Sequence, residues 1–353
     1  MGSFCPLTFT FQKFNSVASV SSPITPSQRP NKDAPRVTVV MAAYNAMPYL
    51  PSSVDSILNQ TLSNFRMIIV NDGSTDSSID YLNSINDPRV QVIHQENCGQ
   101  QAAANRAIEQ AETEFIARMD ADDIAVPDRL AKQTRFLDTH PEVGLVGSQF
   151  QYLGERGVGA TSSLACSHQK IYHELIHNRH AICNCTTMFR TKLFLDLGGY
   201  WEHNISEDWD WFLRAGEEMA LANLPDPLIH FRLHSTSINA RRMVESQLHN
   251  EFACELARRR QRGLPKISFQ KFCADHRFQR WPTSLLFKLD CYSIEQYRVA
   301  VADIVDQRLI AGYGRLAWSM ACSPNRVAHR LKRMLKNDAS TFRANFGSDQ
   351  KSA

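Results

Sequence analysis

The 353-residue sequence lacks the patterns that define several large classes of proteins. It contains no GxGxxG stretch and no GxxxxGKS or GxxxxGKT stretch, which excludes a dinucleotide-binding fingerprint and a phosphate-binding P-loop. Its nine cysteines form no CxxC pair, and their odd number argues for reduced thiols in a cytosolic setting rather than a secreted disulfide framework. Glycine and proline number only 15 each, which excludes collagen-like and disordered classes. An ordinary globular protein remains, with one large domain or two smaller ones.

The sequence also lacks the apolar runs that direct a chain into or across a membrane. No apolar stretch reaches the ~18 residues that span a bilayer, so no transmembrane helix is expected. The chain does not start with a basic segment followed by a long apolar run, so no secretory signal is expected. Both observations favour a cytoplasmic location. The Ser, Pro, Thr and Gln content of residues 16–35 predicts a flexible lead-in over residues 1–36.

The net charge of +3 is divided unevenly along the chain. Residues 1–240 hold 18 Lys and Arg against 26 Asp and Glu, a net −8, whereas residues 241–353 hold 21 against 10, a net +11. This division predicts two regions with different roles. We expect an α/β domain over residues 37–238 and a basic, mainly helical region over residues 239–353.

Short β-branched runs alternate with helix-forming segments after the lead-in. Strands separated by helices of about ten to fifteen residues indicate a parallel sheet with right-handed crossovers. Such a sheet binds ligands at the carboxyl ends of its strands. The expected strands are residues 37–41, 66–70, 90–94 and 115–119, and the expected helices are residues 49–58, 77–86 and 100–111.

Polar and acidic residues gather where these strands end. The segments that follow the four strands include Tyr44-Asn45, Asn71 to Ser74, Asn97 to Gly99 and Asp120 to Asp123. An acidic loop cannot hold phosphates by itself, but it can do so through a divalent cation, and oxygen ligands suit Mg²⁺ or Mn²⁺. The sequence therefore predicts a cation-assisted diphosphate site at this edge of the sheet.

Two acidic groups carry this hypothesis, and each has a plain structural alternative. Asp120, Asp122 and Asp123 directly follow an expected strand, where neighbouring carboxylates repel one another unless a cation compensates them. The alternative for them is a solvated acidic turn or a helix cap. Glu207 and Asp208 enter a helical pattern, where they either compensate the helix dipole or supply a general base to an acceptor hydroxyl.

Five motifs, in this order and spacing, closely resemble those of the family 2 glycosyltransferases of the glycosyltransferase-A fold. The resemblance covers about residues 37–238, over half of the chain. It implies an α/β fold with a mostly parallel sheet flanked by helices, followed here by a mainly helical C-terminal region. The motifs are VTVVMAAYN at residues 37–45, IVNDGSTD at 69–76, NCG at 97–99 with Asn105, MDADD at 119–123, and Glu207-Asp208.

The resemblance also implies a reaction. A sugar is transferred with inversion from a nucleotide sugar, most often a UDP-sugar, to a hydroxyl of a growing polysaccharide or glycolipid. The implied cofactor is Mn²⁺ or Mg²⁺, which offsets charge on the departing diphosphate. In this resemblance Asp122 binds the metal and Asp208 is the catalytic base. The implied donor-binding residues are Ala43, Tyr44, Asn45, Asp72, Asn105 and Asp120.

Further positions match the family through the segments around them. Gly198, Gly199 and Glu207 lie in the segment that lines the acceptor side in the family, although a plain helix stop equally explains the two glycines. His234 stands where many relatives have a histidine near the diphosphate or metal, and a surface histidine is its alternative. The sequence departs from the family at Ala104, where many relatives have an arginine. The positive partner of the phosphates is therefore not identified.

Two other functions compete with this interpretation. HELIH at residues 173–177 satisfies the HExxH pattern, which in zinc peptidases places two histidines on one helix face. No metzincin continuation follows it, and an amphipathic helix with polar residues in solvent explains it as well. The second competitor is a non-catalytic domain that binds a sugar nucleotide without turnover. The presence of both the acidic metal motif and a residue resembling the base argues against it.

Basic residues recur among apolar ones at helical spacing over residues 241–262 and 318–336. A basic amphipathic helix can lie on anionic lipid headgroups, which predicts peripheral contact with the cytoplasmic face of a membrane, near a lipid-linked acceptor. The alternative is a solvated helix packed against the catalytic domain. Nucleic acid is not an expected partner, because recognisable binding modules and aromatic stacking platforms are missing from this region.

Overall fold

A nine-stranded sheet is the central element of the described residues. The computed structural model describes residues 34–201, 207–233, 243–275 and 283–324. The described residues from Pro35 onward group into one compact unit. The strands are β1 (Val37–Ala43), β2 (Arg66–Asp72), β3 (Val90–Gln95), β4 (Phe115–Asp120), β5 (Ile124–Ala125), β6 (Val143–Gly154), β7 (Gly157–Thr161), β8 (Met188–Arg190) and β9 (Ala220–Arg232).

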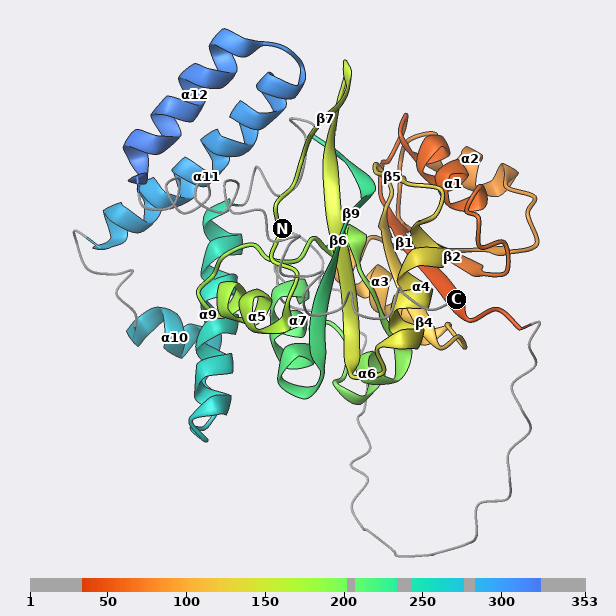
Figure 1. Ribbon diagram of the computed structural model, residues 1–353, viewed down its shortest axis with the longest axis horizontal. Helices are drawn as coiled ribbons and strands as arrows, with labels where there is room; N and C mark the ends of the chain where they lie inside the picture. Colours follow the sequence, from red (N-terminus) through yellow and green to blue (C-terminus); the bar gives the residue numbers. More distant parts are fainter. Residues whose placement is uncertain (1–33, 202–206, 234–242, 276–282, 325–353) are drawn as a thin grey trace, which may run out of the picture. The chain divides into compact units, whose positions relative to one another are not determined.

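The strand order is β3-β2-β1-β4-β8-β6-β9-β5, and β7 pairs with β6. The first four strands in this order pair in parallel, as predicted, and each extends one or two residues beyond its expected end. β8 runs antiparallel to both β4 and β6, whereas β9 lies parallel to β6. Figure 1 shows β6 and β9 running side by side as the two longest strands. The sheet is therefore mostly parallel, which confirms the predicted α/β class.

Helices cover both faces of the sheet because its buried strands are apolar on both sides. Alternate residues of β1 show this: Val39 and Met41 pack in one core, whereas Val40 packs in the other. The helices on the first face are α1 (Leu50–Leu58), α2 (Ser78–Ser84) and α4 (Arg129–Thr139). Those on the second face are α3 (Gln100–Glu109), α5 (His168–Ile176), α6 (Thr191–Asp196) and α7 (Glu207–Glu218).

The described residues beyond the sheet are mainly helical, as expected. They form α9 (Met243–Gln261), α10 (Phe269–Asp275), α11 (Thr283–Val305) and α12 (Leu309–Cys322). Within the ranges that the structure describes, none of the helices combines the length and apolarity that crossing a membrane requires.

The first basic segment packs against the sheet domain. On α9, Arg258 Nη2 donates to the carbonyl of Ile176 at 2.9 Å. Arg260 Nε lies 2.6 Å from Glu217 Oε2 on α7. For α9, these contacts favour the alternative of a helix packed against the catalytic domain over a helix that faces lipid. Residues 325–336 of the second basic segment lie outside the described residues.

Candidate active site

The carboxyl ends of β2, β1 and β4 lie along one edge of the sheet. Ala42 of β1 pairs with Val70 of β2 on one side and with Asp120 of β4 on the other. Asp72, the last residue of β2, therefore lies across β1 from Asp120. Neighbouring strands are ~4.8 Å apart, so two strands that flank a third are about 10 Å apart. The structure thus brings Asp72 and Asp120 to one edge, as the sequence predicted for a parallel sheet.

Asn45 ties together the loops that follow β1 and β2. Its backbone N–H donates to Ser74 Oγ at 3.0 Å, and its Oδ1 accepts the N–H of Thr75 at 2.7 Å. Beside it, Ala43 is fully buried at the end of β1, while the Tyr44 side chain is 49% exposed. The visible role of Asn45 is to shape this edge, and donor binding by these three residues stays a prediction.

Asp72 is buried and fixes the loop that follows β3. Its Oδ1 accepts hydrogen bonds from Gln95 Nε2 at 2.7 Å and from the N–H of Cys98 at 2.9 Å. Its Oδ2 accepts the N–H of Gly99 at 2.9 Å. Three of the roughly four lone-pair positions of this carboxylate are therefore used inside the protein. A donor contact through Asp72 stays a prediction.

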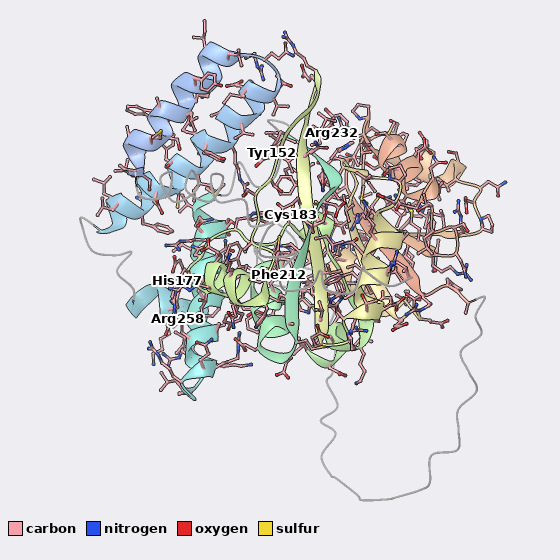
Figure 2. The ribbon with its side chains drawn as sticks, in the orientation of Figure 1. Tyr152, His177, Cys183, Phe212, Arg232 and Arg258 are labelled. Carbon is pink, nitrogen blue, oxygen red and sulfur yellow. The ribbon has the colours of Figure 1, made fainter. Side chains whose placement is uncertain are left out.

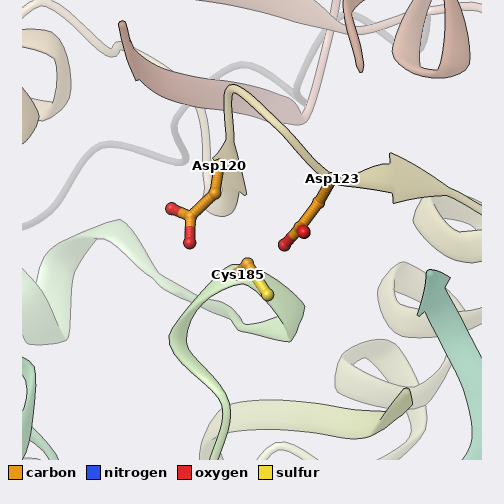
Figure 3. Close-up of side chains that lie close together, drawn as sticks. All are labelled: Asp120, Asp123 and Cys185. Carbon is orange, nitrogen blue, oxygen red and sulfur yellow. The ribbon is translucent and has the colours of Figure 1, made fainter. Parts of the chain in front are cut away.

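Asp120, Asp123 and Cys185 come together where β4 ends (Figure 3). One ligand atom from each lies within 4.8 Å of the others, and they are the single such group among the residues that the structure describes. Both carboxylates point toward Cys185, which lies in the 3₁₀ turn η1 (Asn184–Thr186). Asp122, the expected metal ligand, is outside this group, whereas Asp120, expected to contact the donor, is in it.

The acidic loop is held by its neighbours on both sides. Asp123 Oδ1 accepts the backbone N–H of Arg232 at 2.8 Å, and the Asp122 carbonyl accepts Arg232 Nε at 2.7 Å. Ser53 on α1 donates to the Asp123 carbonyl at 2.6 Å. Figure 2 shows Arg232 at the end of β9. His234, the other expected metal ligand, lies outside the described residues.

The protonation of the cluster reflects its burial. Burial raises the pKa of Asp120 to about 6, and the charges of Asp122 and Asp208 add to that shift. Burial, followed by the charges of Asp122 and Asp120, raises the pKa of Asp123 well above its usual range. A hydrogen bond with Cys183 and burial raise the pKa of the Cys185 thiol well above its usual range. Without a cation, burial therefore favours the neutral forms of Asp123 and Cys185, whereas Asp120 becomes protonated only as the pH falls to about 6.

Two buried arginines compensate part of this charge. Arg118 is 1% exposed, and among the described atoms its Nε and Nη1 have no hydrogen-bond partner. Its charge acts against the upward pKa shifts of Asp120 and Asp208. Arg129 donates from Nη2 to the Arg118 carbonyl at 2.6 Å, and burial lowers its pKa to about 10, so it stays positive at neutral pH.

The sequence analysis missed both arginines, although a signal was present. Arg118 is a single cation inside a buried apolar strand, two residues before Asp120, and period-two alternation puts both side chains on one face of β4. A positive charge in that position is costly unless acidic groups lie beside it.

The ligand chemistry of the site fits a divalent cation. Four carboxyl groups, those of Asp120, Asp122, Asp123 and Asp208, lie near one another and outnumber the arginines beside them, Arg118, Arg129 and Arg232. Carboxylate oxygens are the ligands that Mg²⁺ and Mn²⁺ prefer. The residues present therefore suit the expected cofactor.

Asp208 lies at the amino end of α7, near the acidic cluster. Its charge contributes to the raised pKa of Asp120. Burial raises the pKa of Asp208, while the N–H of Trp209 and the charge of Arg118 act in the opposite direction. The role of Asp208 as the catalytic base stays a prediction. Glu207, expected on the acceptor side, is the first residue of α7.

The two glycines end α6. Gly198 and Gly199 have φ values of +76° and +69°, and the N–H of Gly199 donates to the Phe194 carbonyl at 3.0 Å. Asn105 on α3 holds the next residue, because its Nδ2 donates to the Tyr200 carbonyl at 2.9 Å and its Oδ1 accepts the Tyr200 N–H at 3.1 Å. A helix stop explains the glycines, and the acceptor-side and donor-binding roles of these residues stay predictions.

The HExxH pattern does not form a site in the part of the chain that the structure describes. The side chains of His173, on α5, and His177, which directly follows α5, are both exposed, and their rings are tilted by 43° with centroids 4.4 Å apart. Glu174 points inward and lies 3.6 Å from Arg179. Figure 2 shows His177 well apart from Arg232 at the acidic edge. Across the described ranges, no third potential ligand joins the two histidines.

Comparisons with known proteins agree with this geometry. The sequence profile described as "Glycosyl transferase family 2" matches residues 38–198. The amylovoran biosynthesis glycosyltransferase AmsE of Erwinia amylovora is 31% identical over 58% of this chain and 79% of its own length. The UDP-Glc:alpha-D-GlcNAc-diphosphoundecaprenol beta-1,3-glucosyltransferase WfaP of Escherichia coli is 28% identical over 59% of this chain and 82% of its own length.

A solved structure shares the fold. The mannosyltransferase PcManGT from Pyrobaculum calidifontis, solved in complex with GDP-Man and Mn²⁺, superposes with a TM-score of 0.51. The superposition covers 90% of this chain and 88% of that chain, at 18% sequence identity.

Proposed function

This chain belongs to glycosyl transferase family 2, and we propose that it transfers a sugar from a UDP-sugar to an acceptor hydroxyl with inversion at the anomeric carbon. The observation that carries this proposal is the meeting of the acidic cluster at the end of β4 with Asp208 and the buried Arg118. Residues 37–238 form the proposed catalytic domain. A non-catalytic sugar-nucleotide-binding domain would not require a base beside the metal site.

The proposed metal ligands belong to the loop that follows β4. Asp122 would hold Mn²⁺ or Mg²⁺ together with the carboxylates of Asp120 and Asp123, and His234 is a further proposed ligand. When bound, the cation neutralises the charge that develops on the departing diphosphate. Arg232 holds the loop in place through the Asp122 carbonyl and the Asp123 carboxylate. The loop is thereby ordered before the donor binds.

Asp208 is the proposed base. Its raised pKa strengthens it as a proton acceptor, and the nearby positive charge of Arg118 favours its ionised form. The acceptor hydroxyl would give its proton to Asp208 while its oxygen attacks the anomeric carbon from the face opposite the diphosphate. A single displacement of this kind inverts the configuration. Donor positioning is assigned to the edge formed by Ala43, Tyr44, Asn45, Asp72, Asn105 and Asp120.

The relatives suggest the biological context. WfaP is named for a UDP-Glc donor and a diphosphoundecaprenol-linked acceptor, and AmsE for amylovoran biosynthesis. We propose by analogy that this chain acts in polysaccharide or glycolipid synthesis, with a lipid-linked acceptor at the cytoplasmic face of a membrane. Gly198, Gly199 and Glu207 are proposed on the acceptor side.

The direct test is calorimetric titration of UDP and GDP into the protein with and without Mn²⁺, followed by a panel of UDP- and GDP-sugars scored for transfer or hydrolysis. We expect UDP to bind more tightly with Mn²⁺, and Asp122→Ala to remove that gain. Asp226→Ala is the matched control, because its carboxylate pairs with Lys132 at 3.0 Å on the surface. Preferential GDP binding would overturn the UDP assignment, and metal-independent binding would overturn the cation site.

A further inference from the structure

The hairpin formed by α11 and α12 exposes large apolar side chains. Nine of the fourteen exposed large hydrophobic residues of the described chain lie on these two helices. Ile310 is 94% exposed, and Leu286, Tyr313 and Trp318 are 61%, 58% and 56% exposed. Such a concentration of exposed apolar side chains marks an interaction site.

Small residues form part of the contact between the two helices. Ser293 Oγ donates to the Ser319 carbonyl at 2.8 Å, and Ser319 Oγ donates to the Ser293 carbonyl at 2.8 Å. Gly312 faces Ala300, whose carbonyl oxygen would lie 3.1 Å from a Cβ at the glycine. Ser293, Ala300 and Ser319 are at most 2% exposed. Ile304 of α11 also lies in this contact, because its Cγ1 would be 2.6 Å from the same Cβ. Small residues that let two helices approach closely, with large apolar residues facing outward, are typical of helices that pack in lipid.

The apolar surface of α12 extends around most of the helix. At 100° per residue, Leu309, Tyr313 and Trp318 lie at about 0°, 40° and 180° around its axis. In this 14-residue helix, Arg315 is the one charged residue, and it lies 3.1 Å from Asp303 of α11. Little charge is therefore presented on the outward side.

The hairpin is attached to the sheet domain at its turn. Asp306 Oδ1 accepts the N–H of Glu155, in the β6–β7 connection, at 2.8 Å. On the first half of α11, Cys291 and Ile294 pack with Met243 of α9. These contacts fix one side of the hairpin to the protein and leave the large apolar residues facing outward.

We propose that the α11–α12 hairpin docks on an anionic lipid bilayer, with the side chains of Ile310, Tyr313 and Trp318 entering the interface. This inference deepens the proposed function and rests on its membrane-linked acceptor. The net charge of the segment after α12 favours an anionic bilayer, rather than a second copy of the chain, as the partner of this surface. In the sequence after α12, residues 325–353 hold seven Lys and Arg against two Asp and Glu, and such a net positive segment attracts anionic headgroups.

The length of α12 sets the depth of docking. Fourteen residues extend about 21 Å, which is less than the ~30 Å hydrocarbon core. The hairpin therefore lies at one leaflet, and tyrosine and tryptophan are the aromatic residues favoured at that depth. This orientation would place the protein beside a lipid-linked acceptor without a membrane span.

Vesicle flotation of the full chain tests the proposal. We expect binding to phosphatidylcholine vesicles with 30% phosphatidylglycerol and weaker binding to pure phosphatidylcholine. The triple variant Ile310→Ser, Tyr313→Ser, Trp318→Ser should bind roughly 10–100-fold less, because three apolar side chains no longer leave water. The double variant Leu195→Ser, Leu264→Ser is the matched control, since both residues are about half exposed outside the hairpin, and it should bind like the parent.

A second readout locates the contact. Brominated lipids should quench tryptophan fluorescence in the parent, and Trp318→Phe should remove most of that quenching while leaving flotation intact. Equal flotation of the triple variant and the parent would overturn the proposal, as would a parent that floats with neither vesicle. A parent dimer in sedimentation that the triple variant converts to monomer would assign the surface to a second copy instead. Mn²⁺-dependent UDP binding, measured on the same variants, separates failure of this inference from failure of the proposed function.

Discussion

Replacing Asp208 and Asp210 by asparagine, one at a time, should give opposite results although both lie on one turn of α7. Asp210 is fully buried, and Arg214 Nε lies 2.6 Å from its Oδ2. Breaking a buried ion pair costs about 3–5 kcal/mol, and asparagine keeps one acceptor oxygen, so we expect a loss of about 3 kcal/mol. That loss corresponds to a melting temperature roughly 6–12 °C lower. The folded Asp210→Asn protein should keep its transfer activity per molecule.

Asp208→Asn should abolish most activity without lowering stability at neutral pH. A general base contributes about 10²–10⁴-fold to the rate, so kcat should fall by that factor. Burial raises the pKa of Asp208 above its ordinary value of 3.8. A group with a raised folded-state pKa stabilises the fold below its unfolded pKa, and that contribution is lost as the pH rises through the folded pKa.

Melting temperatures between pH 4 and pH 8 measure this linkage, because asparagine does not titrate. The melting temperature of the parent minus that of Asp208→Asn should be largest near pH 4 and should decrease as the pH rises. Transfer should be assayed on the same preparations with the donor found in the nucleotide-sugar panel. The reasoning is refuted if Asp208→Asn retains full transfer activity, or if its stability relative to the parent falls as the pH rises.

Three further results are expected. Arg118→Met should raise the pKa of Asp208 and move the acid limb of the kcat/KM profile to higher pH, because the nearby positive charge is gone; an unmoved limb would contradict its role. Gly199→Ala should cost about 1–2 kcal/mol in thermal unfolding, because φ is +69° and its Cβ would lie 3.1 Å from Asn105 Oδ1. Gly198→Ala, with open space around its Cβ, should cost less, and the reverse order would be inconsistent with the helix-stop geometry. Alanine at both histidines of the HExxH pattern should leave Mn²⁺-dependent UDP binding unchanged, whereas zinc retained by the parent and lost in this variant would revive the peptidase hypothesis.

The parallel half of the sheet was predictable because its signal is local. Each of the four expected strands is a largely apolar run followed by polar residues, and the first three are followed by an expected helix; all four strands are present. Parallel pairing then places the strand ends at one edge, which is why Asp72 and Asp120 were expected together. The family followed from the order of five motifs, a pattern that no single motif provides.

The other half of the sheet was not predicted, since its pairing is not local. β8 has only three residues, and it lies between β4 and β6 with antiparallel pairing to both. Its position depends on contacts between segments far apart in the chain. A short strand of this kind carries too few residues for a hydrophobic period to identify it.

The sequence by itself determined which residue types stand at the strand ends, because apolar runs and their spacing locate the end of each buried strand to within two residues. Only the tertiary structure decided how those residues are partnered. It placed Arg118 beside Asp120 and Asp208, joined Cys185 to the acidic cluster, and used Asn45 to hold two loops together. The physical reason is that charge compensation and burial depend on distances between side chains that the chain brings together only when it folds.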